Sequence, residues 1–100
     1  MIAPKRLRPA KYVLRLYVTG VSPRSARSIR RIKDICEEHL KGRYSLDVID
    51  IYQRPTLARD EQIIATPTLI KVLPAPLRRF VGDLSNNRLL LGLDLRKQRR

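Results

Sequence analysis

The sequence predicts a single α/β domain in which strands and helices alternate along the chain. Three observations support this fold class. Residues Tyr12–Val18 alternate in the manner of a strand, a capped amphipathic helix follows directly, and an apolar strand-forming run lies between Pro67 and Pro74. One hundred residues are enough for one domain only. We therefore expect a folded unit over residues 11–95.

The first half of that unit is predicted to contain a strand, a helix and a second strand. The strand Tyr12–Val18 is ended by Gly20, and Ser22 then caps a helix that has Pro23 at its first position. Tyr44–Tyr52 is the second predicted strand. Between the two strands, apolar residues recur at helical spacing as far as the stop at Gly42: Ala26, Ile29, Ile32, Cys36 and Leu40.

The second half adds a short helix at 56–64, two strands and a closing helix. The strand Thr68–Val72 is bounded by prolines, because Pro67 cannot donate to a sheet ladder and Pro74 interrupts the run. Arg78–Val81 is predicted as a fourth strand, and Ser85–Leu95 as an amphipathic helix in which Gly92 is about 1 kcal/mol less favourable than Ala. The resulting order, βαβαββα, is that of a thioredoxin-like fold.

The charge is strongly basic and unevenly placed. The net charge is +13, and ten Lys or Arg residues precede the first acidic residue, Asp34. Such an excess indicates an acidic partner surface or nucleic acid, and a solubilising surface is the alternative. A small nucleic-acid-associated domain is the second function considered, although the absence of Trp and the single Phe argue against base stacking. We expect a flexible basic arm at 1–10 and a basic tail at 96–100.

Charge is also crowded onto the first helix, against its dipole. Either a partner uses this basic face or solvent screens it. The residues concerned are Arg24, Arg27, Arg30 and Arg31.

The motifs of catalysis are missing, so we predict a protein that is not an enzyme and has no cofactor or metal. A thioredoxin-like oxidoreductase needs a thiol at the start of its first helix, where this chain has Ser22 and Pro23. Cys36, the only cysteine, falls on the apolar stripe of that helix and is predicted to be a buried, inert thiol. A Cys36–His39 dyad is the alternative. No apolar run approaches the roughly 20 residues that span a membrane, and residues 1–8 do not resemble a signal peptide, which predicts a cytoplasmic location.

Several ordered motifs resemble the KaiB family of circadian-clock proteins. They are Tyr12–Gly20, Ala65–Leu69, Lys71–Pro74, Arg78–Asn86 and Leu91–Asp94. The resemblance implies a timing adaptor with two folds. Family members rest as a tetramer with a βαββααβ ground-state fold and bind the hexameric KaiC ATPase as a monomer in the thioredoxin-like fold. We therefore expect the free chain to form a homo-oligomer, either a dimer or a tetramer. In cyanobacteria the KaiC-bound form sequesters KaiA and displaces the histidine kinase SasA, which shifts KaiC toward dephosphorylation.

The resemblance also assigns fold-switch positions. Tyr12, Gly92 and Asp94 match positions whose replacement shifts the balance between the two folds. In addition, the residues themselves indicate slow switching, since X-Pro bonds isomerise slowly and the short run after Pro67 is apolar enough for a strand or a buried helix. The prolines concerned are Pro67, Pro74 and Pro76.

Partner-binding positions are implied in the same way. Arg27, Lys71, Arg78 and Arg79 match a basic cleft of the ground-state tetramer. Where family members present small or basic residues to KaiC, this chain has Ser45, Asp47 and Gln62. An acidic tail is likewise replaced by a basic one. These departures argue against binding to a cyanobacterial-type KaiC ring. They indicate a divergent member, for which KaiA is not expected as a partner.

Overall fold

The computed structural model of the protein describes residues 11–82, 84, 89–90 and 92–93. Its elements are β1 (Tyr12–Val18), α1 (Pro23–His39), β2 (Tyr44–Asp50), α2 (Pro55–Asp60), β3 (Thr68–Leu73) and β4 (Arg78–Val81). The predicted order is confirmed for these elements. The basic arm and the basic tail predicted at the two ends fall outside the described residues.

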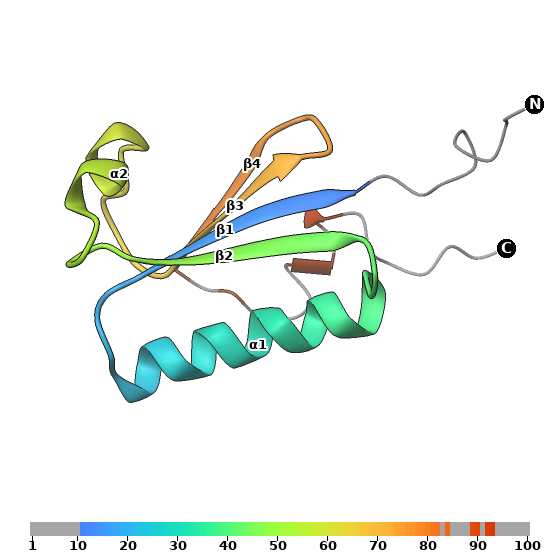
Figure 1. Cartoon of the computed structure of the whole chain (residues 1–100), viewed down its shortest axis with the longest axis horizontal. Helices are drawn as coiled ribbons and strands as arrows, with labels where there is room; N and C mark the ends of the chain where they lie inside the picture. The colour runs from blue at the N-terminus through green and yellow to red at the C-terminus, as the bar shows by residue number, and fades with distance from the viewer. Residues whose placement is uncertain (1–10, 83, 85–88, 91, 94–100) are drawn as a thin grey trace, which may run out of the picture.

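The four strands form one sheet in the order β2-β1-β3-β4 (Figure 1). β1 and β2 are parallel, whereas β3 is antiparallel to both β1 and β4. Parallel neighbours need a crossover connection, and α1 supplies it. α1 lies along one face of the sheet and α2 stands on the other side, at one end (Figure 1). This is the mixed α/β, thioredoxin-like arrangement that the sequence predicts.

The larger core lies between the sheet and α1. Leu14 and Leu16 of β1 point into it and are fully buried, together with Ile32 of α1 and Leu69 of β3. Burying each such side chain contributes about 1.5–3 kcal/mol to folding, so this layer is the main source of stability.

Local chemistry places the ends of α1 where the sequence predicts them. The Ser22 hydroxyl accepts a hydrogen bond from the Ser25 backbone N–H at 3.1 Å, and Pro23 occupies the first turn. The helix ends at His39, and Gly42 adopts a φ of +81° in the turn that follows. Glycine reaches this left-handed conformation without strain.

The predicted apolar stripe of α1 is wrong at Ala26, which is exposed. Ser25 is buried in its place, because its hydroxyl donates to the Thr19 carbonyl at 3.2 Å. A neighbouring helical residue is turned by about 100°, so a buried Ser25 leaves Ala26 facing solvent. Ile35 is also buried and completes the face.

A smaller core lies between α2 and one end of the opposite face. It consists of Tyr17, Ile49 and Ile70, with Leu57 of α2 packed against it. Because α2 has only six residues, it covers part of this face and leaves the rest accessible.

Two predicted boundaries near α2 are wrong. β2 ends at Asp50 instead of Tyr52, because the Asp50 carboxylate accepts a hydrogen bond from the Tyr52 N–H at 2.9 Å and stabilises a turn. α2 covers Pro55–Asp60 instead of 56–64, and Gln62 has a φ of +58° that no helix continues.

The proline-bounded strand is confirmed. β3 begins directly after Pro67 and ends at Leu73, one residue beyond the prediction. The Thr66–Pro67, Leu73–Pro74 and Ala75–Pro76 peptide bonds are cis.

Part of the predicted closing helix, Ser85–Leu95, falls outside the described residues. Within the described part, Leu89, Leu90 and Gly92 are helical. Leu89 and Leu93 are buried in the larger core. No helix in the described ranges is long and apolar enough to cross a membrane.

Candidate functional site

The loop after β1 occupies the position where thioredoxin-like enzymes carry their thiol, and here it holds hydroxyl groups. Thr19 and Thr66 share a side-chain hydrogen bond across a pocket of about 350 Å³ that Ser22, Ser25 and Pro67 also line. Hydroxyls without a neighbouring base are weak nucleophiles.

The loop is held by a carboxylate from the neighbouring strand. Asp50 Oδ1 accepts hydrogen bonds from the backbone N–H of Gly20 at 3.0 Å and of Tyr52 at 2.9 Å. Gly20 has a φ of +61°, and a Cβ there would lie 3.3 Å from the Tyr52 ring. One carboxylate thus organises two loops at this end of the sheet.

Cys36 is buried in the larger core, as predicted. Burial, and to a lesser degree the negative charge of Glu37, raises the pKa of the Cys36 thiol to about 11. The thiolate is the nucleophilic form, so Cys36 is suppressed as a nucleophile. His39 lies 3.9 Å from Glu38. Among the described residues, no group of three His, Cys, Asp or Glu side chains could hold a metal ion.

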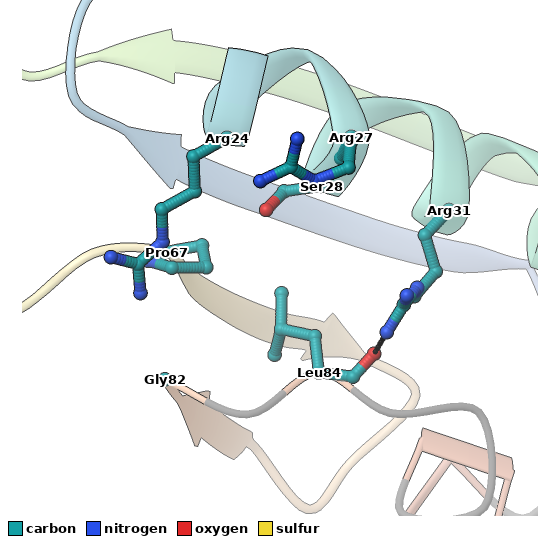
Figure 2. A pocket seen from close by; sticks show the side chains of 7 residues that line it. All are labelled: Arg24, Arg27, Ser28, Arg31, Pro67, Gly82 and Leu84. Atoms are coloured by element: carbon teal, nitrogen blue, oxygen red, sulfur yellow. Dashed lines mark hydrogen bonds between the residues drawn. The ribbon is translucent and has the colours of Figure 1, made fainter. Parts of the chain in front are cut away.

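A pocket of about 230 Å³ lies between α1 and the segment after β4 (Figure 2). Arg24, Arg27 and Arg31 line it from α1, and Ser28 adds a hydroxyl from the same side. The facing wall consists of Pro67, Gly82 and Leu84. We call this the arginine pocket.

One hydrogen bond joins the two walls of the arginine pocket, and another lies within the facing wall. Arg31 Nη1 donates to the Leu84 carbonyl at 3.0 Å, as Figure 2 shows. The Gly82 N–H donates to the Pro67 carbonyl at 2.9 Å. Neither Arg24 nor Arg27 has an ion pair within the described part of the chain. The pocket is therefore a concentration of positive charge with a defined shape.

Part of the face that carries α2 stays open, and an ion-pair network crosses it. Glu61 Oε2 lies 3.6 Å from Nη1 of Arg15 in β1, and Glu61 Oε1 lies 3.6 Å from Nη2 of Arg79 in β4. The two arginines are the register partners of Ile70 in β3, one on each side of it. Asp47 of β2 is the register partner of Arg15. β1, β2 and β4 thus each contribute a charged side chain to one line of register partners across the sheet.

The three predicted KaiC-facing positions lie around this network. Ser45 and Asp47 are exposed on β2, two residues apart, so they share a face of the sheet. Gln62 is exposed beside Glu61. We call the surface formed by Arg15, Ser45, Asp47, Glu61, Gln62 and Arg79 the open sheet face.

The four residues predicted for a basic cleft do not form one cleft in this fold. Arg27 lines the arginine pocket and Arg79 belongs to the open sheet face. Lys71 is buried, and its Nζ donates to the Pro74 carbonyl at 2.7 Å. Arg78 is exposed and is the register partner of Lys71. Since the cleft is implied for the ground-state fold, it stays a prediction about that fold.

Two of the predicted fold-switch residues lie where the described residues 92–93 pack against the sheet. The Tyr12 hydroxyl is buried and donates to the Leu93 carbonyl at 2.9 Å. Gly92 lies against Phe80, where an added Cβ would be 2.5 Å from Cζ of the ring and closer still to Cε2. Helix propensity alone predicts that Ala at position 92 would stabilise the helix. This prediction is wrong in this fold, because the Phe80 ring already fills the space that the added methyl group would need. Asp94 falls outside the described residues.

The remaining fold-switch prolines frame β3. Pro67 is buried at its start and Pro74 is half-buried after its end, whereas Pro76 is exposed. Their role in switching stays a prediction.

Sequence reasoning missed the roles of Arg15 and Glu61, because their contact joins β1 to the end of α2 and no local pattern encodes it. It did find the basic half of α1. The spacing of Arg24, Arg27 and Arg31 at i, i+3 and i+7 was the available signal that these three share a helix face and Arg30 does not.

Comparison with known proteins identifies relatives over most of the chain. The KaiB domain family model matches residues 15–94. A circadian clock oscillator protein KaiB from Thermostichus vulcanus is 53% identical over 84% of this chain and 79% of its own length. The same protein from Prochlorococcus marinus (strain MIT 9303) is 51% identical over 84% of this chain and 71% of its own length.

Solved structures show the same fold. The N-terminal domain of Synechococcus elongatus SasA superposes with a TM-score of 0.72 at 25% identity, covering 100% of this chain and 98% of that domain. Chloroplastic thioredoxin z superposes with a TM-score of 0.68 at 18% identity, covering 90% and 86% of the two chains. The second likeness concerns the fold alone.

The fold and the site together define a thioredoxin-like domain that has kept the scaffold and lacks the thiol at the start of its first helix. Its open sheet face and its arginine pocket both carry charged side chains at the surface. The chain belongs to the KaiB family of circadian clock proteins.

Proposed function

We propose that this protein is a non-enzymatic timing adaptor that binds a KaiC-like hexameric ATPase and modulates the phosphorylation state of that ATPase. The observation that carries the proposal is the identity of 53% to a circadian clock oscillator protein KaiB over 84% of the chain. The buried Cys36 supports a role without thiol chemistry. A cytoplasmic location is part of the proposal.

A SasA-like histidine kinase is the second proposed partner of the system. The N-terminal domain of SasA has the same fold as this chain along its whole length. Two domains with one architecture are suited to compete for one surface of the ATPase. KaiA is not proposed as a partner, because the basic tail and the other departures from the family pattern indicate a divergent member. The departures at Ser45, Asp47 and Gln62 concern the KaiC-facing positions, so the proposed ATPase differs from a cyanobacterial-type ring.

The open sheet face is the proposed docking surface for the ATPase. It is accessible because α2 covers only part of the sheet, and its side chains are polar and of both signs. Asp47 and Gln62 lie at its exposed edge. Interfaces of this kind owe their specificity to charge complementarity more than to buried area.

Slow fold switching from a resting tetramer to a binding-competent monomer is also proposed. The chain would rest as βαββααβ and bind in the thioredoxin-like arrangement. Support comes from β3, which lies between Pro67 and Pro74 and is buried over its first four residues. In the switch, Tyr12 would release the Leu93 carbonyl.

Binding to the KaiC-like ATPase of the same cell, measured by surface plasmon resonance with ATP present, tests the proposal. We expect Asp47→Ala and Gln62→Ala each to change the affinity by several fold. Lys33→Ala, an exposed change on the outer side of α1, is the matched control and should bind like the wild type. Absence of binding by the wild-type chain over a day of incubation would contradict the adaptor role.

A nucleic-acid-associated role is the alternative, and the net charge of +13 is the observation in its favour. Phosphate contacts make affinity fall steeply with salt. Retention on DNA with such a salt dependence, together with no binding to the ATPase, would favour this second function.

A further inference from the structure

The arginine pocket concentrates three guanidinium groups, and no carboxylate is among the lining residues that the structure describes. Arg24, Arg27 and Arg31 extend from one face of α1, and no acidic residue occupies the first turn of the helix. Like charges three or four residues apart on a helix repel one another and destabilise it. Among the described residues, no salt bridge compensates this repulsion.

The pocket has donors aimed into a bounded space. Figure 2 shows Arg24 extending toward Pro67 and Arg31 reaching Leu84, with Ser28 between them on the helix wall. The hydrogen bond from Arg31 to the Leu84 carbonyl fixes one guanidinium while leaving its other N–H groups available. The facing wall is itself fixed, because the Gly82 N–H is bound to the Pro67 carbonyl.

We propose that the arginine pocket is a binding site for a phosphate group, as the free dianion or as a monoester. Guanidinium forks match the oxygens of a phosphate in a bidentate way, and Arg is the preferred residue for such recognition. A tetrahedral dianion offers acceptors in several directions, so it can engage all three arginines at once. A single carboxylate has two oxygens in one plane and can satisfy one fork.

The pocket contacts the phosphate group of a ligand and does not recognise the group to which that phosphate is attached. Its apolar lining consists of Pro67 and Leu84, and its described lining includes no aromatic side chain on which a nucleobase could stack. We therefore expect a phosphorylated side chain and a nucleotide monophosphate to bind equally well. The site is separate from the open sheet face and does not depend on the ATPase.

Titration of the full chain with inorganic phosphate, followed by NMR of the arginine side-chain Nε–Hε signals, tests the site. Chloride at matched ionic strength is the reference. We expect saturable shifts of the Arg24, Arg27 and Arg31 signals and about tenfold or greater weakening in Arg27→Gln, since charged hydrogen bonds are the strong ones. Arg30→Gln is the matched control, because Arg30 lies on the same helix beside Lys33 and Asp34, outside the pocket.

A second variant, a pH series and two monoester ligands extend this experiment. Arg27→Lys keeps the charge but loses the fork, and it should bind more weakly than the wild type and more strongly than Arg27→Gln. The affinity for the monoesters O-phosphoserine and AMP should fall below about pH 6, where a phosphate monoester becomes a monoanion. O-phosphoserine and AMP should bind alike. Non-saturating shifts, equal losses in Arg27→Gln and Arg30→Gln, or AMP binding tenfold more tightly than O-phosphoserine would overturn the assignment.

Discussion

Replacing Gly92 by Ala tests the packing between the end of the chain and β4. A Cβ built at position 92 lies 2.5 Å from Cζ of Phe80 and closer still to Cε2, well inside van der Waals contact. Phe80 is 5% exposed and packed in the larger core, so its ring has little room to move away. Either the ring or the helical segment must shift when the methyl group is added.

Two opposing effects set the magnitude of the change. Helix propensity favours Ala over Gly by about 1 kcal/mol. Overpacking a filled core costs about 1–3 kcal/mol. We therefore expect Gly92→Ala to lower the free energy of unfolding of this fold by about 1 kcal/mol, which is a roughly fivefold change in population.

A double-mutant cycle with Phe80→Leu separates the two effects. Leucine lacks the ring atoms that meet the added methyl group, so Gly92→Ala in this background should keep only its propensity gain. Urea unfolding of the four proteins at a concentration where the chain is monomeric gives the coupling energy. If Gly92→Ala has the same effect in the wild-type and in the Phe80→Leu background, the steric argument fails.

Three further predictions concern the described side chains. At pH 8, alkylation of Cys36 should be about 100-fold slower in the folded protein than in urea, because burial raises the pKa of its thiol to about 11 from 9.0; equal rates would contradict burial. Glu37→Gln should lower the pKa of Tyr44 from about 12 toward 10.0, since the hydrogen bond from the Tyr44 hydroxyl to Glu37 is the main cause of the raised value; NMR of the ring carbons follows this, and an unchanged titration would remove the cause. Asp50→Ala should lower the free energy of unfolding by about 1–3 kcal/mol through the loss of its bonds to Gly20 and Tyr52, whereas Asp50→Asn, which keeps an acceptor oxygen, should lose less; calorimetry showing equal losses would argue against the hydrogen bonds.

The strands and the long helix were predictable because their signals are local. Tyr12–Val18 alternates, Ser22 and Pro23 define a helix start, and Pro67 marks where β3 begins. Each signal acts over a few residues and needs no knowledge of the rest of the chain. The position of Cys36 on the apolar stripe likewise predicted its burial.

The errors arose where a tertiary contact overrides the local pattern. Ala26 fits the apolar stripe by spacing, but the bond from Ser25 to the Thr19 carbonyl rotates the helix so that Ala26 faces solvent. The end of β2 depends on the Asp50 carboxylate, which no strand propensity describes. The ion pairs of Glu61 with Arg15 and Arg79 join three separate elements, so sequence spacing carries no trace of them.

Two of the three fold-switch positions implied by family resemblance, Tyr12 and Gly92, lie close to one another in the described structure. Tyr12 and Gly92 are 80 residues apart in the sequence, yet both lie where the end of the chain meets the sheet. The Tyr12 hydroxyl binds the Leu93 carbonyl, and Gly92 leaves room for the Phe80 ring that packs beside it. If this attachment controls the proposed switch, Tyr12→Phe should loosen it by about 1 kcal/mol, the typical value of one buried hydrogen bond. Hydrogen exchange should then report faster opening at Leu89 and Leu93 and unchanged protection in β1. Equal acceleration throughout the sheet would mean that the end of the chain does not open as a separate unit, and that the switch must begin elsewhere.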